Sequence, residues 1–404
     1  MPKGEYPVEY LANPNINKPI EEIYGDIDAY TNEFFEEDIE YHRHIDFFVA
    51  LPPTIYEGKF LKGIFFSQAV EYLYELYPQL SELFLSMAYT MWGSYSGSTS
   101  ADAYLTLYNN KHRSNWFRKT NPGRKDKLLI PLQDADFTNE YYMAPVFGVK
   151  KDIDVLCVAR LQAIKNLPVI AMALKVYNQK YPEKIRMTLI VGKDFGDNLT
   201  NLATYEKETL RQIIAVLGDP DKYINIIPSI SHDSLSQYYT RAKVCVLGSL
   251  FEGKNRVINE AMSCNTPVIC FKDFNKYARG EEQAFPEGAG LYAPEFTAES
   301  LADTIHTVIN NQSEFKPRYK YLQNNGRKNF LNTCIDGFPY YEKELPEYVQ
   351  GQHYQNLWLD LAVQYNYQSS LEKFLYGGNF TASSHVSGLG YIDKAVKFYF
   401  ERFG

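Results

Sequence analysis

The sequence contains few cysteines, and they do not form the patterns of disulfide or zinc proteins. Only five occur in 404 residues, no two of them form a C-x-x-C pair, and several lie within apolar runs. Disulfide frameworks use paired cysteines in oxidising compartments, and zinc sites use closely spaced ligands. We therefore expect reduced thiols, no structural metal site and a cytoplasmic location.

Long apolar runs and an excess of positive charge are also missing. No stretch of about 18 apolar residues could span a membrane, and the first residues, MPKGEYPVEYLANPN, have no apolar signal-peptide core. Acidic residues outnumber basic ones by 49 to 41, which gives a net charge of -8. Because nucleic-acid binding depends on cations that neutralise phosphates, this balance argues against a nucleic-acid partner.

Positive charge is nevertheless concentrated in one segment, residues 111–127. Its basic side chains are Lys111, Arg113, Arg118, Lys119, Arg124, Lys125 and Lys127. One interpretation is peripheral contact with anionic lipid at the inner membrane surface, or with another phosphate-bearing molecule. The other is the solvated face of a helix and loop.

The composition is otherwise that of a globular protein. Hydrophobic residues make up 45% and charged residues 22%, so the chain can bury enough apolar surface to offset the entropy lost on folding. At about 150 residues per domain, the length predicts two or three domains. Aromatic residues reach 15%, and we expect most of them in the core.

In residues 148–315, short apolar runs alternate with longer amphipathic segments. The apolar runs predict strands at 154–159, 186–191, 223–227, 243–247, 267–271 and 290–292. The amphipathic segments predict helices at 167–181, 205–217, 234–240, 256–263 and 298–310. This alternation is typical of a doubly wound parallel sheet covered on both faces. Such sheets bind ligands at the carboxyl ends of their strands.

The flanking regions are less regular. Residues 1–147 predict a smaller α/β domain, with strands at 45–51, 63–66, 103–108 and 128–131 and helices at 66–77 and 110–119. Residues 316–404 are expected to be mainly helical. Their last segment, 391–403, places Ile392, Val396 and Tyr399 on one side of an amphipathic helix.

Two acids, Glu252 and Glu260, flank the start of the helix predicted at 256–263. The N-terminus of that helix, near Asn255 and Arg256, presents backbone N–H groups and partial positive charge, which suit an anion. Carboxylates beside an anion site suit a ligand that carries both phosphate and sugar hydroxyls. Taken alone, two such acids more often cap a helix in solvent, but the surrounding strand–turn–helix–turn–strand pattern favours a ligand site.

Two cations, Arg160 and Lys165, follow the first strand of the same domain, just before the helix that Pro168 helps to start. Cations in this position can converge on a diphosphate and stabilise the charge that develops on a leaving phosphate. Alone they would be interpreted as exposed loop cations. Their presence at the same predicted sheet edge as the two acids favours one shared binding site.

Four short motifs resemble those of a known family. They are R-L-x-x-x-K-N at 160–166, S-x-x-E-G at 249–253, Glu-Ala-Met at 260–262 and Thr-Pro-Val at 266–268. Together they resemble the retaining glycosyltransferases of group 1, family 4. The resemblance implies an α/β fold of the GT-B type, in which two Rossmann-like domains face a cleft and a C-terminal helix crosses back. The implied parts are a reduced acceptor-side domain (1–147), a nucleotide-sugar domain (148–315) and a returning helical segment (316–404).

The resemblance also implies the reaction and the roles of the site residues. A hexosyl group would pass from a nucleotide-diphosphate sugar to a sugar, lipid-linked or small-molecule acceptor, with retention of configuration. Arg160 and Lys165 would hold the diphosphate, without a metal ion or other cofactor. Glu252 would contact the transferred sugar as the catalytic residue, and Glu260 the ribose. The segment implied to bind the donor phosphates comprises Gly253, Lys254, Asn255, Arg256 and Val257.

Two other functions remain open from the sequence. The reduced N-terminal region favours, as one alternative, a non-catalytic protein that binds nucleotide sugars or acts as a scaffold. A sugar phosphorylase or a nucleotide-sugar epimerase on the same fold is another. An epimerase would interconvert sugar nucleotides without an acceptor, whereas a transferase would not.

Overall fold

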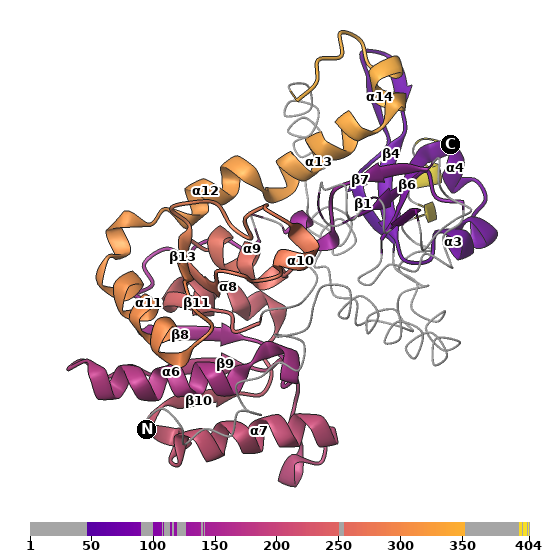
Figure 1. Cartoon of the computed structure of the whole chain (residues 1–404). Helices are drawn as coiled ribbons and strands as arrows, with labels where there is room; N and C mark the ends of the chain where they lie inside the picture. The colour runs from indigo at the N-terminus through magenta and orange to yellow at the C-terminus, as the bar shows by residue number, and fades with distance from the viewer. Residues whose placement is uncertain are drawn as a thin grey trace. The chain divides into compact units, whose positions relative to one another are not determined.

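We describe a computed structural model of the chain (Figure 1). It describes residues 47–89, 100–106, 127–138, 142–249 and 254–351, together with single residues and short stretches at 108, 114, 117–118, 140, 396–397, 399–401 and 403. The chain divides into two compact units. Unit 1 comprises Met1–Ile23 and Glu140–Asn324, and unit 2 comprises Tyr24–Asn139 and Asn325–Gly404.

Unit 1 contains a parallel sheet of six strands in the order β10-β9-β8-β11-β12-β13. The strands are β8 (Ile153–Val158), β9 (Met187–Ile190), β10 (Ile224–Ile227), β11 (Ala242–Val246), β12 (Val268–Phe271) and β13 (Gly290–Ala293). Numbered by their place in the chain, they follow the order 3-2-1-4-5-6 that is typical of doubly wound dinucleotide-binding sheets. In this order the direction of winding reverses between β8 and β11.

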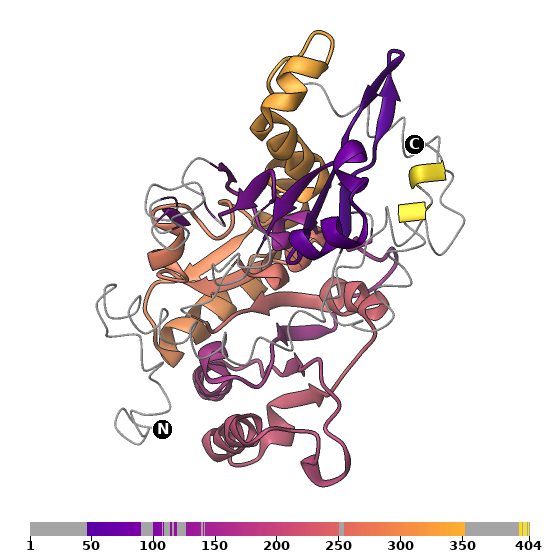
Figure 2. The ribbon, with the colours of Figure 1, turned by 90° about the vertical axis from the view of Figure 1, so that its right-hand side faces the viewer.

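Helices cover both faces of this sheet (Figures 1 and 2). They are α6 (Leu167–Lys180), α7 (Thr204–Leu217), α8 (His232–Arg241), α9 (Arg256–Ser263), α10 (Lys276–Arg279), α11 (Ala298–Asn310) and α12 (Pro317–Asn324). One core receives Leu174, Ile213 and Ile305 from α6, α7 and α11. A second core receives side chains from α8, α9 and α12. The strands and helices predicted between 154 and 310 are thus confirmed, with ends that differ by a few residues.

Unit 2 contains a second sheet, of five strands in the order β1-β4-β5-β6-β7. The strands are β1 (Phe48–Leu51), β4 (Gly63–Ser67), β5 (Phe84–Ala88), β6 (Ala103–Leu105) and β7 (Leu128–Ile130). Strand β1 is antiparallel to β4, and the remaining neighbours are parallel. The hairpin of β2 (Thr54–Tyr56) and β3 (Lys59–Leu61) extends from β1 and β4, shown in indigo in Figure 2.

Four helices complete the described part of unit 2. They are α3 (Val70–Leu76), α4 (Leu80–Leu83), α13 (Gly326–Gly337) and α14 (Pro339–Glu344). Phe330 and Tyr341, from the last two, join the same buried core as the sheet. The core also contains Val396 and Tyr399, which lie within the segment predicted as the last helix. The α/β class is confirmed by the two largely parallel sheets.

Two predictions in the first half of the chain need correction. The helix predicted at 66–77 begins only at Val70, because Phe66 lies in β4 and is fully buried. Strand β5 was not predicted, since its short apolar sequence follows the helical segment α4 directly and periodicity does not separate a buried strand from a buried helix. The helix predicted at 110–119 lies largely outside the described residues, as does most of 391–403.

The helices described here are too short or too polar to span a bilayer. None of them, within the described ranges, combines the length and the apolar content that a membrane span requires.

Close packing of β12 against β13 predicts the effect of one substitution. A Cβ atom at Gly290 would lie 1.9 Å from the Val268 carbonyl oxygen. We expect Gly290→Ala to lower the free energy of unfolding by at least the roughly 1–3 kcal/mol of an overpacked core, measured by denaturant unfolding. Gly218→Ala is the control: its φ is 75° and no atom lies within 4 Å of the added Cβ, so it carries backbone strain without a collision. Equal losses for the two variants would contradict the prediction.

Candidate functional site

The predicted site lies where the winding of the unit 1 sheet reverses. Strands β8 and β11 are parallel neighbours, with Val155 beside Val244 and Leu156 beside Cys245. Their carboxyl ends therefore meet at one edge of the sheet. In open α/β sheets the loops diverge at such a reversal and leave a crevice for ligands.

The loop that follows β8 carries the two predicted cations. Arg160 is exposed and Lys165, at the end of the 3-10 turn Ala163–Lys165, is half-buried. The Gln162 N–H donates to the Arg160 carbonyl at 2.9 Å, and the Lys165 N–H donates to the Gln162 carbonyl at 3.0 Å. These bonds hold both cations on one short, tightly turned segment.

Asn166 joins this loop to the segment after β11. Its φ is 48°, a left-handed conformation that asparagine tolerates better than most residues. The buried Asn166 Nδ2 donates to the Gly248 carbonyl at 3.0 Å. A Cβ atom at Gly248 would lie 2.9 Å from the Lys165 carbonyl oxygen, so the two segments approach closely. The cation loop and the start of the acid-bearing segment are thus in direct contact.

The segment between β11 and α9, which carries Glu252, is described up to Ser249 and again from Lys254. Two predicted residues, Glu252 and Gly253, lie outside the described residues. Asn255 caps helix α9: its Oδ1 accepts the Val257 N–H at 2.8 Å. Lys254 and Arg256 are half-buried. An anion at this helix end would share the Val257 N–H with Asn255 or replace that bond.

Glu260 lies in the second turn of α9 and is only 4% exposed. Tyr239, in the last turn of α8, donates its hydroxyl to Glu260 Oε2 at 2.8 Å. Burial, and next the negative charge of Glu260, raise the pKa of Tyr239 well above its ordinary value. The tyrosine therefore remains a hydrogen-bond donor to the carboxylate. Its role was not predicted, because nothing near Tyr239 in the sequence links it to a residue on the next helix.

A second buried carboxylate, Glu206, was also missed. Its Oε2 accepts the Lys193 ammonium at 2.6 Å and the Ala203 N–H at 2.8 Å. Burial raises the pKa of Glu206, but these hydrogen bonds and the charges of Lys193 and Arg160 outweigh it and hold the pKa below its ordinary value. Lys193 follows β9 as Arg160 follows β8, so the pair lies at the same sheet edge. The available signal was an acid three residues into a helix, which is typical of a capping bond.

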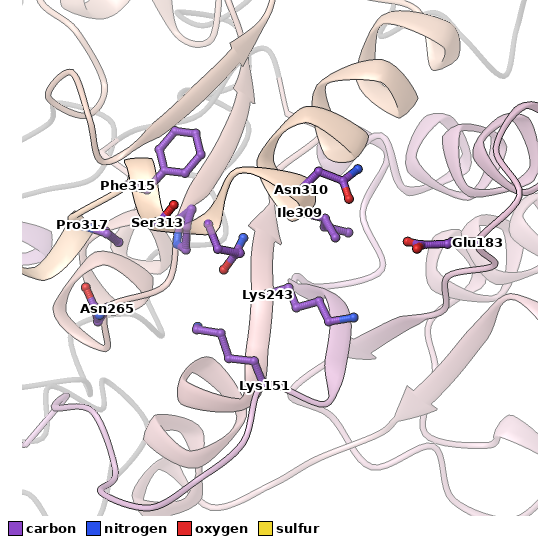
Figure 3. Close-up of a pocket in the computed structure, with 11 residues that line it drawn as sticks. Lys151, Glu183, Lys243, Asn265, Ile309, Asn310, Ser313, Phe315 and Pro317 are labelled. Carbon is purple, nitrogen blue, oxygen red and sulfur yellow. The ribbon is translucent and has the colours of Figure 1, made fainter.

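A pocket of about 500 Å3 lies at the opposite edge of this sheet, beside the amino ends of β8, β11 and β12 (Figure 3). Lys243 and Glu183 point toward one another in it. Both lysines that line the pocket already have partners. Lys243 forms an ion pair with Asp154 at 2.6 Å, and Lys151 Nζ donates to the Ala242 carbonyl at 2.5 Å. The predicted site residues do not line it. Among the described residues, no group of three or more His, Cys, Asp or Glu side chains could hold a metal ion.

Comparison with known families identifies this part of the chain. Residues 143–329 match the family of glycosyl transferases group 1. This segment belongs to that family. It contains β8–β13 and both predicted clusters, and the match confirms the family that the four sequence motifs indicated.

Curated relatives of this group 1 segment are distant and only partly covered. A mannosylfructose-phosphate synthase from Agrobacterium fabrum is 27% identical over 148 residues, which are 37% of this chain and 31% of the relative. A D-inositol 3-phosphate glycosyltransferase from Kineococcus radiotolerans is 26% identical over 171 residues, 41% of this chain and 38% of the relative. The chain thus matches only about a third of the length of these relatives.

Among solved structures, a sucrose-phosphate synthase from Thermosynechococcus elongatus is similar to this chain with 19% identity and a TM-score of 0.43. The alignment covers 62% of this chain and 65% of that one. The α/β assignment of the group 1 segment rests on its own strand order.

The lowered pKa of Glu206 predicts how stability depends on pH. A carboxyl whose folded pKa is depressed stabilises the protein above its unfolded pKa of about 4.3, and that stabilisation is lost as the pH falls through the folded value. We expect Glu206→Gln to lower the free energy of unfolding at pH 7 by about 1–2 kcal/mol. The expected loss of stability is modest because the Lys193 side chain is 41% exposed and solvent weakens its attraction to Glu206.

The measurement is the difference in stability between Glu206→Gln and the unchanged protein from pH 7 down to pH 3. It should shrink as the solution is acidified. Glu208→Gln is the control, because Glu208 lies on the same helix and pairs with Arg211 in solvent. A difference that grows toward low pH would contradict the assignment.

Proposed function

We propose that this protein is a retaining glycosyltransferase. It would move a hexosyl group from a nucleotide-diphosphate sugar to a sugar, lipid-linked or small-molecule acceptor. The observation that supports the proposal most strongly is the Asn166–Gly248 hydrogen bond. That bond ties the loop of Arg160 and Lys165 to the segment that leads into Glu252 and α9, at the reversal point of the sheet.

The chemistry of these groups fits the transfer. In the net reaction, the bond between the sugar C1 and the diphosphate oxygen breaks, an acceptor hydroxyl oxygen bonds to C1 with retention of configuration, and the hydroxyl proton passes to the leaving diphosphate. Negative charge develops on that diphosphate as its bond to C1 breaks. Arg160 and Lys165 would bind that diphosphate, together with N–H groups of the segment 253–257. Preorganised cations stabilise such developing charge, so we propose that the reaction needs no metal ion. Glu252 would contact the transferred sugar and Glu260 the ribose.

The relatives support the class of reaction, but not the substrate. The two curated relatives are a synthase of a mannosyl sugar phosphate and a glycosyltransferase. These names support transfer of a sugar as the chemistry of this chain. We further propose a cytoplasmic location with the basic segment 111–127 against an anionic membrane surface. That segment lies largely outside the described residues.

Substitution of Lys165 tests the cation loop. A hydrogen bond between charged groups contributes roughly 1.5–3 kcal/mol, so Lys165→Ala should lower kcat/KM about 10- to 100-fold. The assay measures nucleotide released from a panel of UDP-, GDP-, ADP- and dTDP-sugars with acceptor extracts. Lys222→Ala is the control, since Lys222 pairs with Asp219 on the surface before β10. Full activity of the Lys165 variant would overturn the assignment of this loop.

Substitution of Glu252 tests the catalytic assignment. Glu252→Ala should abolish transfer and leave the thermal unfolding temperature unchanged, because the cap of helix α9 is supplied by Asn255. Binding of a sugar nucleotide without turnover in the unsubstituted protein, across the whole panel, would favour the non-catalytic alternative. Interconversion of a sugar nucleotide in the absence of acceptor would favour an epimerase.

A further inference from the structure

We propose that Tyr239 is a positioning residue that holds Glu260 in the orientation for recognising the donor ribose, and that it thereby sets a preference for ribose over deoxyribose. This inference rests on the proposed function, in which Glu260 contacts the ribose. It concerns a residue on a different helix, outside the four sequence motifs.

The geometry is that of a buried, hydrogen-bonded pair. Tyr239 is fully buried and Glu260 is 4% exposed. The hydroxyl donates to Glu260 Oε2 at 2.8 Å. Burying an ionised carboxylate is costly unless hydrogen bonds compensate, so a donor on a packed neighbouring helix constrains where the carboxylate lies. The bond links α8 to α9 directly beside the candidate site.

Tyr239 is itself held in place independently of its hydroxyl. Its backbone carbonyl accepts the Thr266 hydroxyl at 2.5 Å, and Thr266 is fully buried in the segment before β12. The next residue, Thr240, donates to the Ser236 carbonyl at 2.7 Å and accepts the Val146 N–H at 3.1 Å. Removing only the hydroxyl of Tyr239 should therefore leave α8 and its aromatic ring where they are.

The Tyr239–Glu260 pair can bind a ligand as well as stabilise the packing of α8 against α9. An ionised carboxylate has about four lone-pair positions, so Glu260 can accept hydrogen bonds from several donors, and we infer that ribose hydroxyls join Tyr239 among them. The raised pKa of Tyr239 keeps its phenol protonated. The hydroxyl therefore donates a hydrogen bond over the whole physiological range of pH. A site that accepts a hydrogen bond from a substrate hydroxyl rejects an analogue that lacks it. How strongly it rejects depends on how firmly the acceptor is held.

The test compares Tyr239→Phe with the unchanged protein and with Tyr238→Phe. Tyr238 is the preceding residue on α8, is half-buried and lies 5.7 Å from the Arg241 guanidinium, so its variant controls for loss of a neighbouring hydroxyl. Binding is measured by calorimetry for UDP, GDP and ADP and for their 2′-deoxy and 3′-deoxy analogues. Thermal unfolding of each variant reports whether the fold is retained.

We expect the unchanged protein and Tyr238→Phe to bind one ribonucleotide at least about tenfold more tightly than a deoxy analogue. A tenfold ratio corresponds to about 1.4 kcal/mol. In Tyr239→Phe the ribonucleotide should lose most of this advantage while the affinity for the deoxy analogue changes little. A purely structural role would weaken both ligands equally and leave their ratio unchanged.

The outcomes separate this inference from the proposed function. An undiminished ratio in Tyr239→Phe, or equal weakening of both ligands, overturns the role of Tyr239 and leaves the transferase proposal intact. Absence of any ribose preference in the unchanged protein also overturns the role of Tyr239 and leaves the transferase proposal intact. Failure to bind any nucleoside diphosphate or nucleotide sugar overturns the proposed function, and this inference with it.

Discussion

The candidate site depends on the close approach of two loops at the reversal point of the unit 1 sheet. Asn166 can donate to the Gly248 carbonyl only because its backbone adopts a left-handed conformation and because Gly248 has no side chain to collide with the Lys165 carbonyl. The parallel pairing of β8 and β11 brings the loops to the same edge. This hydrogen bond from a side-chain amide to a backbone carbonyl, rather than an ion pair, places the cation loop beside the segment that leads to the acids.

Two buried carboxylates, one from each helical layer, flank this edge. Glu206 on α7 is neutralised by Lys193 and also experiences the charge of Arg160. Glu260 on α9 receives the hydroxyl of Tyr239. Buried charge without a partner is strongly unfavourable, so each acid has a defined partner from another element. The edge therefore combines cations with acids whose positions are restrained, an arrangement suited to a ligand that carries both phosphates and hydroxyls.

Unit 2 shows why the first half of the chain was harder to predict. Its strands β6 and β7 contain only three residues each, and although they fall within the strands predicted at 103–108 and 128–131, the five-stranded sheet as a whole was predicted incompletely because β5 was missed. Strand β5 follows α4 without a turn residue between them. In unit 1 longer helices separate the strands, and the pattern of apolar runs is correspondingly clear. The length and spacing of elements, more than their composition, determined how much could be predicted.

The sequence by itself determined the α/β class, the succession of strands and helices between 154 and 310, and the family, because apolar periodicity and short motifs are local properties. Only the tertiary structure decided which strands are neighbours and which side chains meet. Asn166 and Gly248 are 82 positions apart, and Tyr239 and Glu260 are 21 apart. Neither pair leaves a trace in local spacing, since each contact arises from the packing of elements that are distant along the chain.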